Sequence, residues 1–169
     1  IKGIPTASYG QVFNDSRSKT GDYRDSMSLA YSAAPLDRVA LSARFDLGRF
    51  RYTGEYVYDY PPITINRDET IGNWWGGEFQ ATSTLIDGHT LIGGAEYRRD
   101  TSVKQRNFDV DPYFSYLDSK VDGRVWGIYA QDDMRLGETL SLSAGLRYNH
   151  HSTTGGTLNP RLGLIWKPR

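Results

Sequence analysis

The sequence predicts an all-β fold, an antiparallel up-and-down meander of about seven long strands that forms part of a transmembrane β-barrel. Three observations lead to this prediction. Apolar and polar residues alternate over long stretches, as in GIYAQDDMRLGETLSLSAGLRYN, which begins at Gly127. The connections between these stretches are short and long by turns. The composition, with 12 Tyr and 18 Gly, favours strands and turns over helices.

Composition narrows the possible classes of protein. The chain has 169 residues with 20 basic and 20 acidic side chains, so its net charge gives no reason to expect nucleic acid as a partner. It has no cysteine, which excludes disulfides, thiolate metal sites and cysteine nucleophiles. No apolar run approaches the roughly 20 residues of a transmembrane helix, whereas a barrel strand needs only about ten residues of alternation.

The alternation of apolar and polar residues predicts the strands in chain order. They cover residues 21–33, 38–50, 73–86, 89–100, 122–136, 139–150 and 157–167. The tight turns are APLD, IDGH and LGET, and the long loops are residues 51–72, residues 101–121 and the shorter HSTTGGT. Long strands with tight turns at one end and long loops at the other are typical of a transmembrane barrel.

The side chains of these strands separate into an apolar face and a polar face. The apolar face is expected to carry Leu29, Leu41, Phe45, Phe79, Leu91, Leu146 and Leu164. The polar face is expected to line the lumen of a barrel with Arg44, Glu78, Glu96, Arg98, Arg147 and Arg161. Of these, we expect five to form a cross-strand charge ladder on the lumen wall, namely Glu78, Glu96, Arg98, Arg147 and Arg161.

Aromatic residues of the apolar face gather at the two ends of the strands. Near the long loops they are Tyr23, Trp75, Tyr97, Trp126 and Tyr148, and near the tight turns they are Tyr31 and Trp166. An aromatic ring with a polar atom is favourable at a membrane interface, where its body lies in hydrocarbon and its tip in water. The pattern therefore predicts two aromatic girdles.

The aromatic segment from Tyr52 to Pro62 is the best candidate for contacting a ligand. Tyrosine combines a rigid stacking surface with a hydrogen-bonding tip. The candidate ligand-binding residues are Tyr52, Tyr56, Tyr58 and Tyr60. The alternative is that these tyrosines only pack on one another.

Metal-binding and catalytic chemistry have weaker support in the sequence. Asp109, Asp111 and Asp118 form an oxygen-rich loop, but it lacks the Gly turn and the closing Glu of a calcium loop, which favours a solvated loop. His150 and His151 are adjacent on a strand and point to opposite faces, so they are not expected to share a metal ion. No motif joins a carboxylate to a histidine, and we expect no catalytic residues, no metal site, no cofactor and no enzymatic activity.

The run from Gly127 to Asn149, followed by NPRLGLIWKP, resembles the barrel of TonB-dependent outer-membrane receptors. In that family a strand reading Y-A-Q-D-E is followed by a turn, a strand ending G-L-R-Y-D, a loop and N-P-R-L-G-L. This chain departs from the pattern with Asp133 in place of the Glu and Asn149 in place of the last Asp. The stretches GIPTASYGQVFND, NWWGGEFQ and LIGGAEYRRD are also similar to the family.

The resemblance implies TonB-coupled uptake of a scarce nutrient, such as a ferric siderophore or a cobalamin, across the outer membrane of a Gram-negative bacterium. The partners it implies are outer-membrane lipid, a plug domain of the same parent protein, TonB acting through that plug, and a small nutrient ligand; nucleic acid is not expected. Residues 1–169 are then a single internal segment of the receptor barrel, without the plug domain and the C-terminal strand.

Two other functions stay open at this point. The first is a soluble β-sandwich or barrel that binds a ligand or protein. The second is a small barrel of the outer membrane with a structural or adhesive role. Detergent fractionation distinguishes the soluble protein from the other two.

Overall fold

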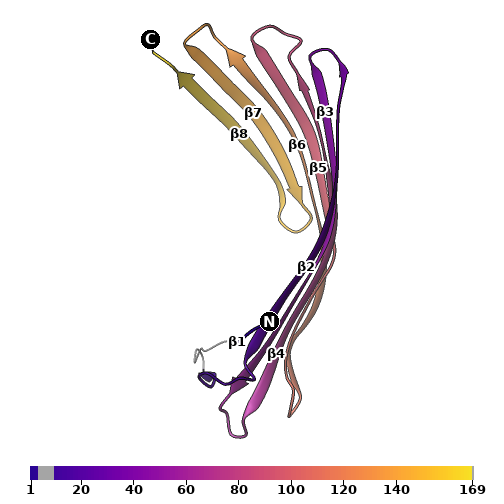
Figure 1. The fold of residues 1–169 in the computed structure, drawn as a ribbon, viewed down its shortest axis with the longest axis vertical. Coiled ribbons are helices and arrows are strands. Elements are labelled where there is room, and N and C mark those ends of the chain that lie inside the picture. Colours follow the sequence, from indigo (N-terminus) through magenta and orange to yellow (C-terminus); the bar gives the residue numbers. More distant parts are fainter. Residues whose placement is uncertain (4–9, 169) are drawn as a thin grey trace. The chain divides into compact units, whose positions relative to one another are not determined.

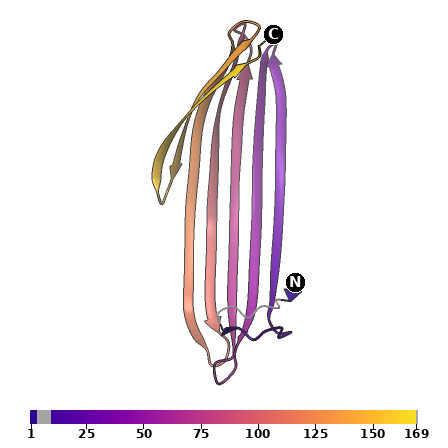
Figure 2. The ribbon, with the colours of Figure 1, turned by 90° about the vertical axis from the view of Figure 1, so that its left-hand side faces the viewer.

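The computed structural model describes residues 1–3 and 10–168, and its strands follow one another across a single sheet (Figures 1 and 2). The strands are β1 (Lys2–Gly3), β2 (Lys19–Leu36), β3 (Val39–Tyr58), β4 (Thr64–Ser83), β5 (His89–Asp109), β6 (Phe114–Arg135), β7 (Leu140–His151) and β8 (Gly155–Trp166). Every strand lies beside its neighbours in sequence, which confirms the predicted antiparallel meander.

The two longest loops predicted from the sequence are wrong, because most of residues 51–72 and 101–121 belong to strands. β3 continues to Tyr58 and β4 begins at Thr64, while β5 continues to Asp109. Only residues 59–63 and 110–113 connect these long strands. The reason is chemical: the segments are rich in β-branched and aromatic residues, which favour strands, and Gly54 and Gly72 in the first of them do not interrupt the strands.

The chain divides into two compact units, which we describe separately. Unit 1 comprises Ile1–Ser26, Leu47–Trp74 and Asp100–Asp122. Unit 2 comprises Met27–Asp46, Trp75–Arg99 and Gly123–Arg169.

Unit 2 carries an exposed apolar face with the predicted phase. In the pairing of β6 with β7 and of β7 with β8, Leu146 is opposite Ala130 and Leu142 is opposite Leu164. Leu146 is 50% exposed and Leu164 is 65% exposed. Val57, in unit 1, is the one buried apolar side chain of the described residues, so no apolar core covers this face. An uncovered apolar surface of this kind marks contact with a membrane or another protein.

Aromatic side chains of unit 2 form two clusters on this apolar face. The ring of Trp75 lies 5.2 Å from Tyr97 and 6.2 Å from Phe45, and Trp126 lies 5.4 Å from Tyr148. The strand segments that follow them to the tight turns, such as 75–83 in β4, have about the 9–11 residues that a tilted strand needs to cross hydrocarbon. Unit 2 therefore has the dimensions of a membrane-crossing wall.

The tight turns of unit 2 are joined to neighbouring strand ends by backbone hydrogen bonds. The amide of Thr84 donates to the carbonyl of Arg38 at 2.9 Å, and the amide of Arg135 donates to Gly88 at 2.7 Å. These bonds place the turns containing APLD, IDGH and LGET along one edge of unit 2, as predicted. Gly88 has a φ of 81°, in the left-handed region that glycine adopts without strain.

Ion pairs connect the strands of unit 1. Glu55 on β3 pairs with Lys19 at 3.0 Å and with Arg67 at 2.5 Å. Arg106 on β5 lies 3.7 Å from Glu69 and 3.8 Å from Asp118. These ion pairs link neighbouring strands from β2 to β6, in a part of the chain where the sequence had mostly suggested loops. Within the described ranges there is no helix long and apolar enough to span a membrane.

Candidate ligand face and polar wall

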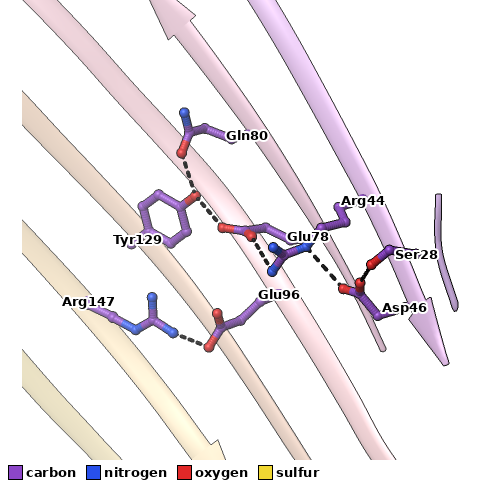
Figure 3. A network of polar contacts seen from close by, with 8 residues as sticks. All are labelled: Ser28, Arg44, Asp46, Glu78, Gln80, Glu96, Tyr129 and Arg147. Atoms are coloured by element: carbon purple, nitrogen blue, oxygen red, sulfur yellow. Dashed lines mark hydrogen bonds and ion pairs between the residues drawn. The ribbon is translucent and has the colours of Figure 1, made fainter. Parts of the chain in front are cut away.

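The polar side chains of unit 2 form a connected network, which we call the polar wall (Figure 3). Arg44 on β3 lies at its centre, with its Nε 3.0 Å from Asp46 and its Nη2 3.4 Å from Glu78 on the next strand. The hydroxyl of Ser28 on β2 donates a hydrogen bond to Asp46. Polar side chains of β2, β3 and β4 are thus linked across the strands.

Tyr129 extends the polar wall from β6 toward β4. Its hydroxyl lies 3.2 Å from Glu78 Oε1 and 3.0 Å from Gln80 Oε1. One hydroxyl proton is shared between these two acceptors. The ring crosses β5 at Gly94, where a Cβ would approach the Phe79 carbonyl oxygen at 2.6 Å and collide with the ring of Tyr129. A side chain at Gly94 would therefore break this link.

A second part of the polar wall joins β5 to β7. Arg147 pairs with Glu96, and its Nε donates to Asn149 Oδ1 at 2.8 Å. The guanidinium of Arg147 also lies 5.5 Å from the ring centre of Tyr129, within reach of a cation–π contact. The two parts of the wall therefore meet at Tyr129.

The last two residues predicted for the polar face occupy different surroundings. Arg98 lies across from Gly76, and a Cβ added at Gly76 would be 3.5 Å from the Cβ of Arg98. Arg161 is exposed on β8, opposite Gly145, and lines a shallow hollow of about 240 Å³ together with Arg147. Of the six side chains predicted for the polar face, the network of Figure 3 contains Arg44, Glu78, Glu96 and Arg147.

The predicted ligand-binding tyrosines lie in unit 1, three on β3 and one in the following turn. Tyr52 and Tyr56 share a hydrogen bond between their hydroxyls. Gly54 lies between them, and a Cβ there would come within 2.6 Å of the Tyr56 ring. Tyr58 and Tyr60 are stacked, with ring centres 5.5 Å apart and planes 7° from parallel. The structure therefore brings the four tyrosines into two pairs.

Unit 1 also contains a hydrogen-bonded group of amide, carboxylate and hydroxyl side chains. Asn66 is buried on β4 and donates to Asn107 Oδ1 at 3.1 Å and to Asp109 Oδ1 at 2.9 Å. Asn107 donates back to Asn66 at 3.0 Å. The hydroxyl of Tyr116 donates to the other oxygen of Asp109 at 2.7 Å. We call these residues together the ligand face, as the candidate place of ligand contact: Tyr52, Tyr56, Tyr58, Tyr60, Asn66, Asp68 and Asp109.

The surroundings raise the pKa of two tyrosines and one aspartate in this region. Burial, followed by the hydrogen bond with Tyr52 and the nearby charge of Asp68, raises the pKa of Tyr56. The hydrogen bond to Asp109 raises the pKa of Tyr116. Burial also raises the pKa of Asp68 above its ordinary value. The hydroxyl groups of Tyr56 and Tyr116 are therefore held in the neutral form that donates hydrogen bonds.

The oxygen-rich segment considered for calcium is divided by the fold. Asp109 is bonded to Asn66 and Tyr116, while Asp118 lies on β6 within reach of Arg106. Among the residues that the structure describes, no group of three or more potential ligands is arranged to hold a metal ion. His150 stacks on Trp126, with ring centres 5.7 Å apart.

Sequence reasoning missed several contacts. Tyr129 and Ser28 enter the polar wall, and Asn66 enters the ligand face, although nothing in the local alternation marks them as partners. His89 Nδ1 also lies 2.8 Å from Asp132 Oδ2, which joins a histidine to a carboxylate although no motif does so. Asp132 is opposite Ala144, so this pair belongs to the apolar face.

Comparison with protein families decides the identity of the fold. The family model described as TonB dependent receptor-like, beta-barrel matches residues 3–169. The chain belongs to this family. As part of a TonB-dependent receptor barrel, it is a component of an outer-membrane receptor and transporter. The family is one of transporters, whose members work with a plug domain, TonB and small ligands. No curated protein matches the chain.

Proposed function

We propose that the chain forms part of the wall of a Gram-negative outer-membrane receptor that takes up a scarce nutrient with energy transmitted by TonB. The two faces of unit 2 carry this proposal. An apolar face with Leu146 half exposed and Leu164 more than half exposed supports contact with lipid, because water makes such a surface unfavourable. Membership of the receptor family supports the same function.

On this proposal the polar wall faces the lumen of the barrel. Arg44, Glu78, Glu96 and Arg147 neutralise one another across the strands, so they stabilise the wall without a large net charge. Arg98 and Arg161 belong to the same lumen surface. This surface is suited to contact the plug domain through exchangeable hydrogen bonds, because each carboxylate has further acceptor positions.

The ligand face of unit 1 is the proposed place of nutrient contact. Its tyrosines combine ring surfaces with hydroxyls, and Tyr60 is more than half exposed. The four tyrosines also pack in pairs, which holds the rings in defined orientations before a ligand arrives. A ferric siderophore or a cobalamin is the cargo that the family first suggests, and the chemistry of this face allows a choice among cargo classes.

Uptake by cells tests the proposal. The full-length receptor is expressed in a Gram-negative host whose growth depends on an imported ferric chelate, cobalamin or oligosaccharide, with and without active TonB. Growth on at least one nutrient is expected to require TonB and to be lost with Tyr52→Ala combined with Tyr56→Ala. Tyr31→Ala, on the exposed apolar face, is the matched control and is expected to leave growth unchanged. Growth that does not depend on TonB would contradict the proposal.

A further inference from the structure

Asp68 is a carboxylate of the ligand face that forms no ion pair within the described residues. It lies on β4, two residues from Asn66, and its charge acts on the hydroxyl of Tyr56. Within the described residues no Lys or Arg forms a salt bridge with it. Its surroundings also withdraw it from water, because burial alone accounts for its raised pKa. A carboxylate in such a place is ready to accept hydrogen bonds from a ligand.

The ion pairs that involve β4 in unit 1 lie on the face of the strand opposite to Asp68. Arg67 and Glu69 flank Asp68 in the sequence and therefore point to the opposite face of β4. Arg67 pairs with Glu55, and Glu69 lies near Arg106. The cations in these contacts thus neutralise carboxylates on the far side of the strand. They do not offset the charge of Asp68 on the ligand face.

The chemistry of the ligand face discriminates between kinds of nutrient. Asp68 and Asp109 would repel an anionic ferric chelate, whose recognition calls for Arg or Lys. Carboxylate and amide oxygens accept hydrogen bonds from hydroxyl groups, while a tyrosine ring offers a flat apolar surface to the C–H side of a sugar ring. The side chains of the ligand face provide both contacts at once.

We propose that the ligand face binds an uncharged, hydroxyl-rich nutrient of the oligosaccharide class. Asp68 and Asp109 accept hydrogen bonds from its hydroxyls, and the Tyr52–Tyr56 pair supplies ring surface and one free hydroxyl donor. This inference rests on the proposed function, since it names the cargo of the same receptor. It also favours an oligosaccharide over the ferric siderophore that the family resemblance first suggests.

Calorimetric titration of the full-length receptor in detergent tests the cargo class. The probes are a set of neutral hexasaccharides from starch, cellulose, xylan and mannan, a ferric tris-catecholate as the anion, and spermidine as the cation. We expect at least one hexasaccharide to bind and the two charged probes not to bind. Asp68→Ala is expected to weaken that binding at least tenfold. Glu69→Ala, one residue away on the opposite face, is the matched control and should leave the affinity within about twofold.

Other outcomes overturn the inference in distinguishable ways. Binding of the ferric tris-catecholate or spermidine, with no hexasaccharide bound, would show that the cargo is charged. Equal losses of affinity in Asp68→Ala and Glu69→Ala would show that the binding site lies elsewhere. Binding of no probe also overturns the oligosaccharide proposal. The proposed function fails separately, if hexasaccharide binds as expected but cells import it equally well without TonB. A circular dichroism spectrum of each variant checks that its strands are intact.

Discussion

The residue that most constrains the polar wall is Gly94, a residue with no side chain. The ring of Tyr129 crosses β5 at this position and reaches Glu78 and Gln80 on the strand beyond. An aromatic side chain can span an intervening strand only where that strand offers no Cβ. The wall is therefore specified by a large residue and a small residue together.

Gly94→Ala is expected to destabilise the barrel by about 1–3 kcal/mol, because the new Cβ overlaps the Tyr129 ring and the Phe79 carbonyl oxygen. The matched control is Gly93→Ala on the preceding residue, where a Cβ would lie 3.7 Å from the Tyr129 carbonyl oxygen, an ordinary van der Waals distance. Thermal unfolding in detergent, followed by gel mobility of the full-length receptor, compares the two. Equal melting temperatures for both variants would contradict this account of the wall.

Asp68 gives a prediction about pH. Burial raises its pKa, so the folded protein binds the proton more readily than the unfolded chain does. The charged form of Asp68 therefore destabilises the fold at neutral pH. As the pH falls through the pKa of Asp68 in the folded protein, its protonation increases the free energy of unfolding. Asp68→Asn is expected to raise the free energy of unfolding at about pH 7 and to lose that advantage at about pH 3.

Asp15 supplies a control of the opposite sign. Its hydrogen bond from Arg17 lowers its pKa to about 2, so its contribution is present above the ordinary value and disappears as the pH falls toward 2. Asp15→Asn should lower stability at neutral pH. Chemical denaturation of both variants at several pH values measures the two trends, and parallel trends would contradict the assigned pKa directions.

At the scale of the strands, alternation was sufficient to predict the faces but not the ends. Leu146 and Arg147 occupy opposite faces because side chains alternate along β7, and that rule needs no knowledge of the neighbours. The ends of β3 and β4 depend on pairing with adjacent strands and on ion pairs such as Glu55 with Arg67. Because Gly and Pro were treated as strand-breaking residues, the strands predicted for β3 and β4 were too short.

Neighbouring positions of β7 give a prediction about the environment of the two faces. Ala144 lies opposite Leu162 on the apolar face, and Ser143 lies opposite Gly163 on the polar face. An arginine in the hydrocarbon costs about 2–4 kcal/mol near the middle of a bilayer, so Ala144→Arg should destabilise the inserted protein by an amount of this order. Ser143→Arg should cost less than about 1 kcal/mol. Reversible unfolding from lipid vesicles provides the measurement, and a larger cost at Ser143 would reverse the assignment of the faces.

At the scale of the whole chain, the apolar face and the open edges of the sheet predict behaviour in water. Residues such as Leu29 and Leu162 are 64% and 78% exposed, and strand edges without a neighbour recruit other chains. The 169-residue chain expressed by itself is expected to be insoluble or oligomeric in buffer and to partition into detergent. Light scattering checks this, and a monodisperse monomer in detergent-free buffer with cooperative unfolding would favour a soluble binding domain.

The candidate site could be predicted only in part for the same reason as the fold. The charge ladder and the tyrosines were visible because residue type and spacing alone suggest them. The contacts of Asn66 with Asn107, and of His89 with Asp132, join residues more than forty positions apart in the sequence. Such contacts depend on the register between strands, which the alternation of a single strand does not determine.

The scarcity of buried apolar side chains also bears on how this protein tolerates mutation. In a soluble domain, substitutions are most harmful in the interior, where each side chain has one shape that fits. Here only Val57 is such a residue among those described. The leucines of the apolar face meet fluid lipid, which adapts to any apolar shape, so Leu, Ile, Val and Phe should exchange there with little effect. Selection on shape instead falls on the polar wall, on Tyr129, Gly94 and the side chains that they contact. A saturation mutagenesis library of the receptor would therefore show the reverse of the pattern in soluble domains. Positions of the apolar face would tolerate most apolar substitutions, and positions of the polar wall would tolerate few substitutions.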